Sequence, residues 1–117
     1  MNAYETKVEQ FLVRIQELGA KFLPDAQCAV LNKSINFLKI RFQIRKDMFF
    51  DVYYNSFRER KDFALVFKGK RIFGYDNYFG WHLHPSTDPD SHVFCQEPPL
   101  VSIFKEVKEI IKKNYKM

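Results

Sequence analysis

Apolar residues recur at helical spacing near the start of the chain. They are Tyr4, Val8, Phe11, Leu12, Ile15 and Leu18. A repeat of three and four residues places these side chains on one face of an α-helix. Asn2 followed by Glu5 resembles a capping box, and Gly19 is a residue type at which helices often end. The pattern therefore predicts an amphipathic helix over about Ala3 to Leu18.

Apolar and polar residues then alternate strictly along two neighbouring segments. Leu38, Ile40, Phe42 and Ile44 alternate with Lys39, Arg41, Gln43 and Arg45, and the run from Met48 to Tyr54 alternates in the same way. A period of two indicates β-strands with one apolar face and one polar face.

We expect these two strands to form a hairpin with a three-residue loop at 45–47. The expected register pairs Ile44 with Met48, Phe42 with Phe50, Ile40 with Val52, Arg41 with Asp51 and Lys39 with Tyr53. A two-residue loop would instead turn Asp51 toward the apolar face, where an unpaired carboxylate is costly.

Four further segments, three strands and a helix, complete the order of elements. Cys28–Leu31 is a candidate short strand, and Phe63–Phe67 and Arg71–Tyr75 predict two strands joined by a reversal at 68–70. Pro98 and Pro99 suit the first turn of a second helix. Its apolar stripe is Leu100, Ile103, Phe104, Val107, Ile110 and Ile111.

Helices at both ends of a hairpin-built sheet predict an α+β fold with four to five mostly antiparallel strands. A chain of 117 residues fits a single domain, 1–117. Thirteen Phe, six Tyr and one Trp predict an aromatic core, and this surplus also suits a homodimer interface.

The charge and the cysteine content indicate the kind of partner and the cellular compartment. A formal charge of +5 favours an anionic partner such as nucleic acid. Cys28 and Cys95 are too few for a disulfide framework, and no apolar run approaches the length of a membrane span. The sequence therefore predicts a cytoplasmic protein without membrane contact. No P-loop, G-x-S-x-G or Rossmann glycine pattern is present, which disfavours nucleotide-dependent enzymes and serine hydrolases.

All three histidines lie in the stretch GYDNYFGWHLHPSTDPDSH, which runs from Gly74 to His92. His82 and His84 point the same way if their segment is extended. Asp76 ends the preceding strand, and a carboxylate there can orient an imidazole. Because histidine titrates near neutrality, we expect His82, His84 and Asp76 to be catalytic residues in acid–base chemistry.

The same histidines are also candidate metal ligands. His82, His84 and His92 could bind a divalent metal together with Asp76 or Asp88. The sequence has neither an H-E-x-x-H motif nor a cysteine partner for such a site. We therefore expect no cofactor and keep a divalent metal as the alternative.

A polar strand face and the histidine loop supply the expected contacts with a substrate. The expected substrate-binding residues are Lys39, Arg41, Arg45, Tyr53, Asn77 and His92. Cations along a strand can follow a phosphate backbone, and a tyrosine ring can stack on a base.

The segment RIFGYDNYFGWHLH resembles the TumE-type toxin family, the toxin half of toxin–antitoxin pairs. Members show a strand ending in G-Y-D-N or a similar x-D-N, then a glycine, then H-x-H, and later a helix of the L-x-x-x-L kind. The matching residues are Gly74, Tyr75, Asp76, Asn77, Gly80, His82 and His84. The resemblance covers about Phe37 to Ile111. It implies a toxin-like protein whose partner is a cognate antitoxin.

These observations lead to one functional hypothesis with two alternatives. The hypothesis is a small metal-independent ribonuclease in which His82 or His84 accepts the 2′-OH proton and a second group protonates the leaving 5′-oxygen. Asp76 would orient a histidine, and Lys39, Arg41 or Arg45 would stabilise the phosphorane. The alternatives are a metal-dependent phosphodiesterase that uses the same histidines and a non-catalytic module that binds nucleic acid or protein.

Overall fold

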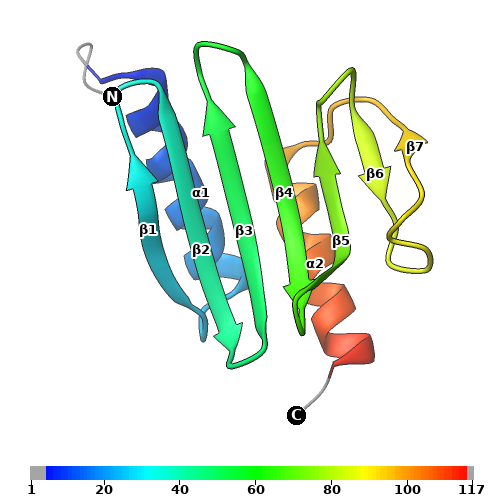
Figure 1. The fold of residues 1–117 in the computed structure, drawn as a ribbon. Coiled ribbons are helices and arrows are strands. Elements are labelled where there is room, and N and C mark those ends of the chain that lie inside the picture. The colour runs from blue at the N-terminus through cyan, green and yellow to red at the C-terminus, as the bar shows by residue number, and fades with distance from the viewer. Residues whose placement is uncertain (1–4, 116–117) are drawn as a thin grey trace.

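The computed structural model describes residues 5–115, which form one antiparallel sheet with a helix at each end of the chain (Figure 1). The strands are β1 (Gln27–Lys33), β2 (Phe37–Arg45), β3 (Met48–Asn55), β4 (Arg60–Phe67), β5 (Lys70–Asp76), β6 (His82–His84) and β7 (Val93–Phe94). The helices are α1 (Lys7–Phe22) and α2 (Leu100–Asn114). The predicted α+β class is confirmed. The predicted number of strands is wrong, because the sheet has seven strands in sequential order.

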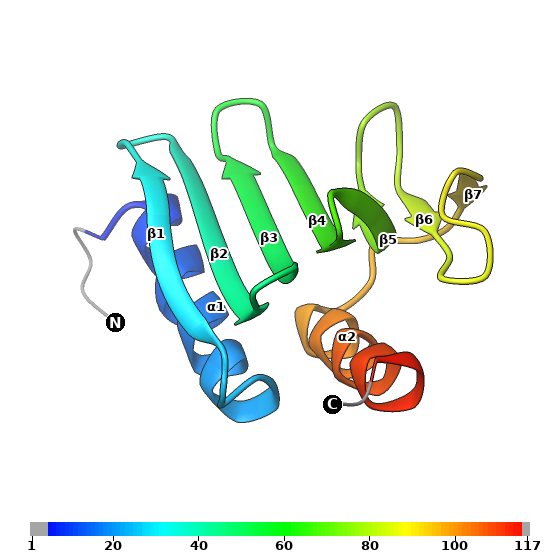
Figure 2. The ribbon, with the colours of Figure 1, turned by 60° about the horizontal axis from the view of Figure 1, so that its bottom comes forward.

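Both helices lie on the same face of the sheet (Figure 2). Their apolar stripes cover the apolar faces of the strands, and the predicted aromatic core forms between the two layers. The ring of Phe104 in α2 meets Phe42 and Phe50 edge-on, with ring centroids 5.8 and 5.3 Å apart. The opposite face of the sheet is left open and carries polar and charged side chains. No helix in the described part of the chain has the length and apolar character needed to cross a lipid bilayer.

The first helix begins and ends later than the sequence pattern predicts. Thr6 caps it, since its Oγ1 accepts a hydrogen bond of 3.0 Å from the backbone N–H of Glu9. The predicted cap at Asn2 and start at Ala3 lie outside the described residues. The helix continues through Gly19 to Phe22. A Cβ at Gly19 would collide with the ring of Phe42, so this glycine allows close packing and does not end the helix.

The β2–β3 hairpin keeps the predicted register but not the predicted loop. Phe42 lies opposite Phe50 and Arg41 opposite Asp51, as expected. The turn contains two residues, Lys46 and Asp47, and Arg45 rather than Ile44 pairs with Met48. A bulge at Ile44 takes up the extra residue, which a two-residue turn alone would not accommodate. Asp51 therefore stays on the polar face.

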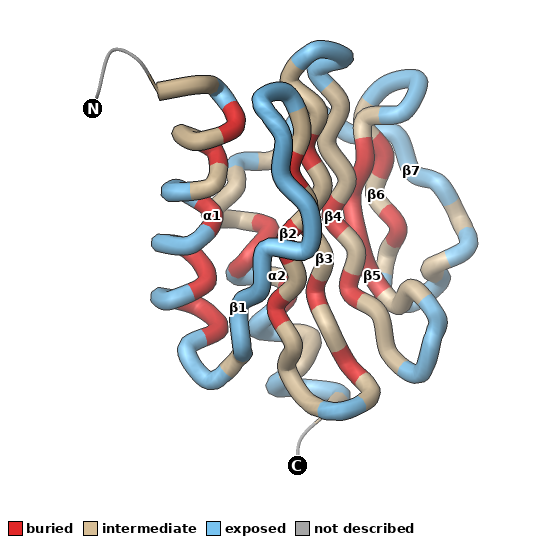
Figure 3. The backbone as a smooth tube through the Cα atoms, turned by 60° about the vertical axis from the view of Figure 1, so that its left-hand side comes forward, coloured by how far each residue is buried: buried red, intermediate tan, exposed pale blue. Residues whose placement is uncertain are grey.

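The strands that the sequence pattern did not identify lie after β5. The H-x-H segment is strand β6, and Val93–Phe94 form the short edge strand β7. At the other edge, the predicted Cys28–Leu31 segment lies within the longer β1. This strand is exposed along its length (Figure 3). Extension of the sheet by β6 and β7 brings the histidine segment onto the open face.

Candidate functional site

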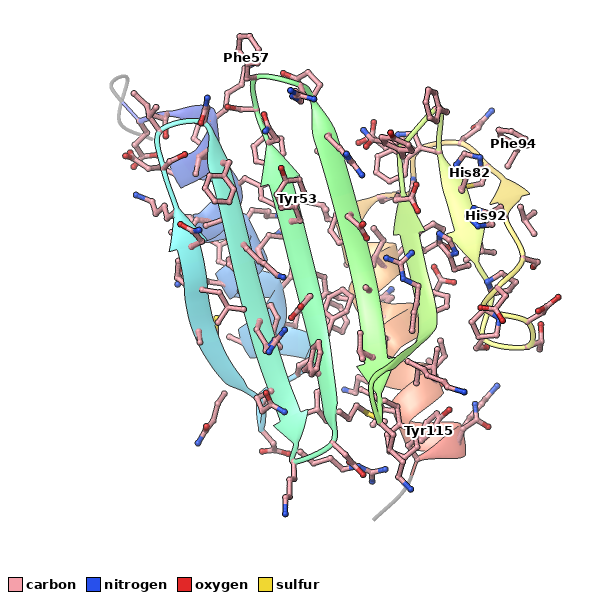
Figure 4. All side chains as sticks on the ribbon, viewed as in Figure 1. Tyr53, Phe57, His82, His92, Phe94 and Tyr115 are labelled. Atoms are coloured by element: carbon pink, nitrogen blue, oxygen red, sulfur yellow. The ribbon has the colours of Figure 1, made fainter. Side chains whose placement is uncertain are left out.

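One row of cross-strand neighbours crosses the open face of the sheet from β2 to β7. The register pairs Lys39 with Tyr53, Tyr53 with Asp62, Asp62 with Asp76, Asp76 with His82, and His82 with Phe94. Residues directly opposite each other on neighbouring strands share a face. Tyr53, His82 and Phe94 of this row are labelled in Figure 4. The sheet thus unites residues that the sequence analysis singled out on three separate segments.

His84 is buried and hydrogen-bonded through both ring nitrogens. Its Nε2 lies 2.6 Å from Oδ2 of Asp76, and its Nδ1 lies 3.3 Å from the carbonyl oxygen of Pro89. Both partners are hydrogen-bond acceptors, one a carboxylate and the other a backbone carbonyl. His84 is therefore fixed beside Asp76 by contacts at both ring nitrogens.

Gly74 allows two strands of the sheet to lie close together beside the site. It lies opposite His84 in the β5–β6 ladder and between β4 and β6 in the sheet. A Cβ at Gly74 would collide with the backbone oxygen of Phe63 in β4. The glycine of the Gly74-Tyr75-Asp76 segment therefore permits the close approach of β4 and β5 next to the site.

The environment of Asp76 favours its ionised form. Burial alone raises the pKa of this carboxyl group. The hydrogen bond to His84, the backbone N–H of Tyr78 at 3.1 Å, and the charges of His84 and Arg71 outweigh burial. The net result is a pKa below the ordinary value, so Asp76 is an anion that holds the His84 ring in place.

His82 lies next to this pair, but its ring is less constrained. Its Nδ1 is buried, lies 3.8 Å from Oδ1 of Asp76, and makes no hydrogen bond with any described residue. The side chain is only 11% exposed. A buried polar atom without a hydrogen-bond partner is uncommon in proteins and often indicates a bound ligand or a functional role. Of the two β6 histidines, His82 is the better placed for proton transfer.

His92 reaches the same place from the loop that precedes β7. Its ring centroid lies 5.7 Å from that of His82 and 4.5 Å from that of His84. The side chain is exposed, unlike those of the β6 histidines. The structure therefore brings all three histidines together with Asp76.

The histidines face a cavity of about 530 Å³, which we call the histidine hollow. It is lined by His82, His84 and His92, the carboxylates of Asp62 and Asp76, the cations Arg60 and Arg71, and the rings of Tyr78, Phe79 and Phe94. A concave site in which titratable and cationic groups converge is a typical binding or catalytic site.

Arg71 and Asp62 are site residues that the sequence analysis did not identify. The Nη2 atom of Arg71 lies 3.1 Å from Oδ1 of Asp62, and its Nη1 lies 3.7 Å from Oδ2 of Asp76. Burial raises the pKa of Asp62 more than the charge of Arg71 lowers it. The guanidinium thus bridges two carboxylates that face each other across β4 and β5, and the β4–β5 register is the signal that could have revealed it.

Arg60 is a second cation that the sequence analysis missed. Its guanidinium carbon lies 4.2 Å from the centroid of the Tyr78 ring. Its Nε is buried and makes no hydrogen bond with any described residue. Arg60 therefore lines the hollow with a positive charge.

Three of the expected substrate-binding residues lie on the open face of the sheet. Lys39 and Tyr53 line a second hollow of about 390 Å³, which shares Arg60, Asp62 and Arg71 with the first. Arg41 lies on the same face, but its guanidinium is held by both oxygens of Asp51 at 2.8 and 2.9 Å. These bonds raise its pKa. Arg41 is thus already paired with a carboxylate.

Arg45 and Asn77 have structural contacts away from the hollow. Arg45 donates to Asp47 at 3.2 Å and to the carbonyl of Tyr115 at 3.1 Å, and Figure 4 shows Tyr115 at the other end of the sheet from His82. Asn77 accepts from the N–H of Lys61 and donates to the carbonyl of Glu59. Its side chain therefore ties the end of β5 to the start of β4.

The residues named as alternative metal ligands, His82, His84 and His92, do not form a metal-binding arrangement with other described side chains. Within residues 5–115, no group of three or more His, Cys, Asp or Glu side chains is placed to hold a metal ion. His84 already directs one nitrogen at Asp76 and the other at Pro89.

Comparison of the chain with protein-family models, curated proteins and solved structures found no match. The geometry of the histidine hollow and the sequence motif are therefore the guides to function.

Proposed function

We propose that this protein is a small metal-independent ribonuclease of the toxin type. The observation that carries the proposal is the pair of imidazoles His82 and His92, whose ring centroids lie 5.7 Å apart in the histidine hollow. This spacing lets one ring reach the attacking oxygen of a phosphodiester while the other reaches the leaving oxygen. Both groups act on the same open side of the sheet.

In the proposed reaction, His82 is the general base. With its Nδ1 directed toward Asp76, its Nε2 accepts the proton of the ribose 2′-OH. The 2′-oxygen then attacks phosphorus, and the bond from phosphorus to the 5′-oxygen breaks. His92 donates a proton to that 5′-oxygen. The products are a 2′,3′-cyclic phosphate and a free 5′-hydroxyl, and no metal or redox partner is required.

Arg71 and Arg60 are the residues best placed to stabilise the phosphorane. Arg71 lies next to Asp76, and Arg60 lines the same hollow. Charge that develops on the phosphoryl oxygens is stabilised by fixed cationic donors in a site of limited solvent access. The Asp76–His84 pair has a positioning role, since its 2.6 Å hydrogen bond fixes the carboxylate that faces His82.

The resemblance to TumE-type toxins supports the proposal that this ribonuclease is a toxin. The G-Y-D-N and H-x-H residues on which it depends include Asp76, His82 and His84, which are neighbours in the fold. The proposal includes a cognate antitoxin as the protein partner and action in the cytoplasm. The surplus of aromatic residues could instead serve a homodimer interface. The formal charge of +5 is consistent with binding RNA.

An RNA-cleavage assay tests the chemistry directly. The wild-type protein in excess EDTA should cleave a labelled RNA that contains both loops and stems, and it should leave the DNA of the same sequence intact. The 5′ fragments should end in a 2′,3′-cyclic phosphate, and the 3′ fragments should begin with a 5′-hydroxyl. The double variant His82→Ala/His84→Ala should be inactive, and circular dichroism should confirm that it is folded.

Two results would overturn the proposal. Unchanged cleavage by the double variant would exclude His82 as the general base and His84 as a positioning residue. Salt-sensitive binding of the RNA by the wild type without any cleavage would instead support a non-catalytic binding module.

A further inference from the structure

Two aromatic side chains stand exposed at the rim of the histidine hollow. Phe79, in the turn between β5 and β6, is 84% exposed, and Phe94 in β7 is 76% exposed. Both line the hollow. Single exposed aromatic residues are common on protein surfaces. Two of them at the rim of one polar cavity that is also lined by arginine side chains are typical of sites that bind single-stranded nucleic acid.

The backbone at Phe79 is not what turn formation alone would select. Its φ is +58°, in the left-handed region that bulky residues rarely adopt, and the following Gly80 has a φ of +100°. Glycine or asparagine at position 79 would form this turn with less strain. Since the Phe79 side chain is almost fully exposed, core packing does not explain why a phenylalanine is there.

The neighbours of the two rings complete two aromatic walls. The Phe79 ring lies 4.4 Å from the Tyr78 ring, and Tyr78 in turn lies under the guanidinium of Arg60. The Phe94 ring lies 4.4 Å from the ring of His82. Figure 4 shows Phe94 beside His82 and His92 at this edge of the sheet. One wall thus comes from the β5–β6 turn and the other from β7, with His82 in the same hollow.

We propose that Phe79 and Phe94 each stack on a nucleobase, so that the histidine hollow binds single-stranded RNA. This inference rests on the proposed function, because it takes RNA as the ligand of the same hollow. A base in a duplex has both faces covered by its neighbours, whereas an unpaired base can stack on a protein ring. Arg60 and Arg71 contact the phosphate between the two bases.

The binding test uses the wild-type protein and a ligand that cannot be cleaved. The probe is a fluorescent, fully 2′-O-methylated RNA of about 12 nucleotides, a length within the usual range for single-strand sites. Its affinity is measured by fluorescence anisotropy in three forms: single strand, matched duplex, and single strand with abasic sites. We expect the single strand to bind more tightly than the duplex or the abasic strand.

The variants Phe79→Ala and Phe94→Ala should each weaken single-strand binding by about 5- to 150-fold, the usual effect of one lost stacking contact. Neither should alter binding of the abasic strand. Phe57→Ala is the matched control, because Phe57 is 80% exposed but is not among the residues that line the hollow. Equal affinity of Phe79→Ala/Phe94→Ala and wild type for the single strand would overturn the inference, as would equal affinity for single strand and duplex.

A parallel cleavage assay separates this inference from the proposed function. If the wild type binds the probe through the two rings but cleaves no unmodified RNA, the ribonuclease proposal fails and the stacking site stands. If the wild type cleaves RNA and the double phenylalanine variant binds and cleaves equally well, the stacking site fails and the ribonuclease proposal stands.

Discussion

The Nε2 atom of His84 and the Oδ2 atom of Asp76 lie 2.6 Å apart on neighbouring strands of the sheet. Asp76 is directly opposite His82, so its contact with His84 is diagonal across the β5–β6 ladder. Diagonal neighbours are within reach of each other on the same face of a sheet. One carboxylate therefore faces both histidines of the H-x-H pair, and its charge matters to the fold as well as to the site.

Replacement Asp76→Asn should lower the free energy of unfolding by about 1–3 kcal/mol at neutral pH, because it removes a charge-assisted hydrogen bond from a buried group. The pKa of Asp76 is lowered in the folded protein, so its contribution is present above the ordinary value of 3.8. The contribution is lost as the pH falls through the lower folded-state value. Urea unfolding over a pH series should show the difference between wild type and variant shrinking in acid.

The exposed aspartate Asp90 in the same loop provides the control for this experiment. Asp90→Asn should leave the free energy of unfolding nearly unchanged at every pH. A difference between Asp76→Asn and wild type that stays constant from neutral to strongly acid pH would contradict the assigned ionisation of Asp76.

Replacement Arg71→Gln should destabilise the fold by about 1–3 kcal/mol at neutral pH, because it leaves two facing carboxylates without the cation between them. Burial already raises the pKa of Asp62. A raised carboxyl pKa means that stability falls as the pH rises through it, and loss of Arg71 should raise this pKa further. The defect should therefore be largest at neutral pH and smaller in acid, as measured by urea unfolding.

A double variant identifies the cause of that defect. Arg71→Gln/Asp62→Asn removes one of the two carboxylates and should recover most of the lost stability at neutral pH. If the double variant is as unstable as Arg71→Gln alone, repulsion between Asp62 and Asp76 is not the reason for the defect.

Replacement Gly19→Ala tests the packing of α1 against the sheet. Alanine favours a helix by up to about 1 kcal/mol over glycine. The new Cβ would nevertheless collide with the buried ring of Phe42, and overpacking of a core costs about 1–3 kcal/mol. We expect net destabilisation in thermal unfolding and partial recovery in Gly19→Ala/Phe42→Leu. A more stable Gly19→Ala protein would mean that the ring of Phe42 moves aside easily.

The sequence pattern predicted most of the sheet because alternation reports directly on which face of a strand is buried. Cross-strand pairs such as Arg41 with Asp51 followed from that pattern alone. The bulge at Ile44 could not be predicted. A two-residue turn with a bulge and a three-residue turn give the same alternation and differ only in where the backbone accommodates one extra residue. The role of Gly19 was also hidden, because a glycine that ends a helix and one that admits a neighbouring ring look the same in sequence.

The candidate site was predictable where its residues are close in sequence. Asp76, His82 and His84 follow one another around a single turn, and the alternation of the H-x-H segment placed both imidazoles on one face. Arg71 and Arg60 were missed because their positions depend on the register between β4 and β5, which contains an irregularity at Leu65 and Val66. Long-range pairing of this kind leaves no periodic signal in the chain.

Removal of metal should not affect the proposed ribonuclease. Both ring nitrogens of His84 face acceptors, so a metal at this ring would have to displace the hydrogen bond to Asp76 or the one to Pro89. Untagged wild-type protein should therefore contain far less than one equivalent of transition metal by mass spectrometry, as should His82→Ala/His84→Ala. RNA cleavage by the wild-type protein should be the same with and without EDTA.

About one zinc per chain in the wild type, absent from the double variant, would make the hollow a metal site. Activity that disappears with EDTA and returns with zinc would then favour a metal-dependent phosphodiesterase built on the same histidines.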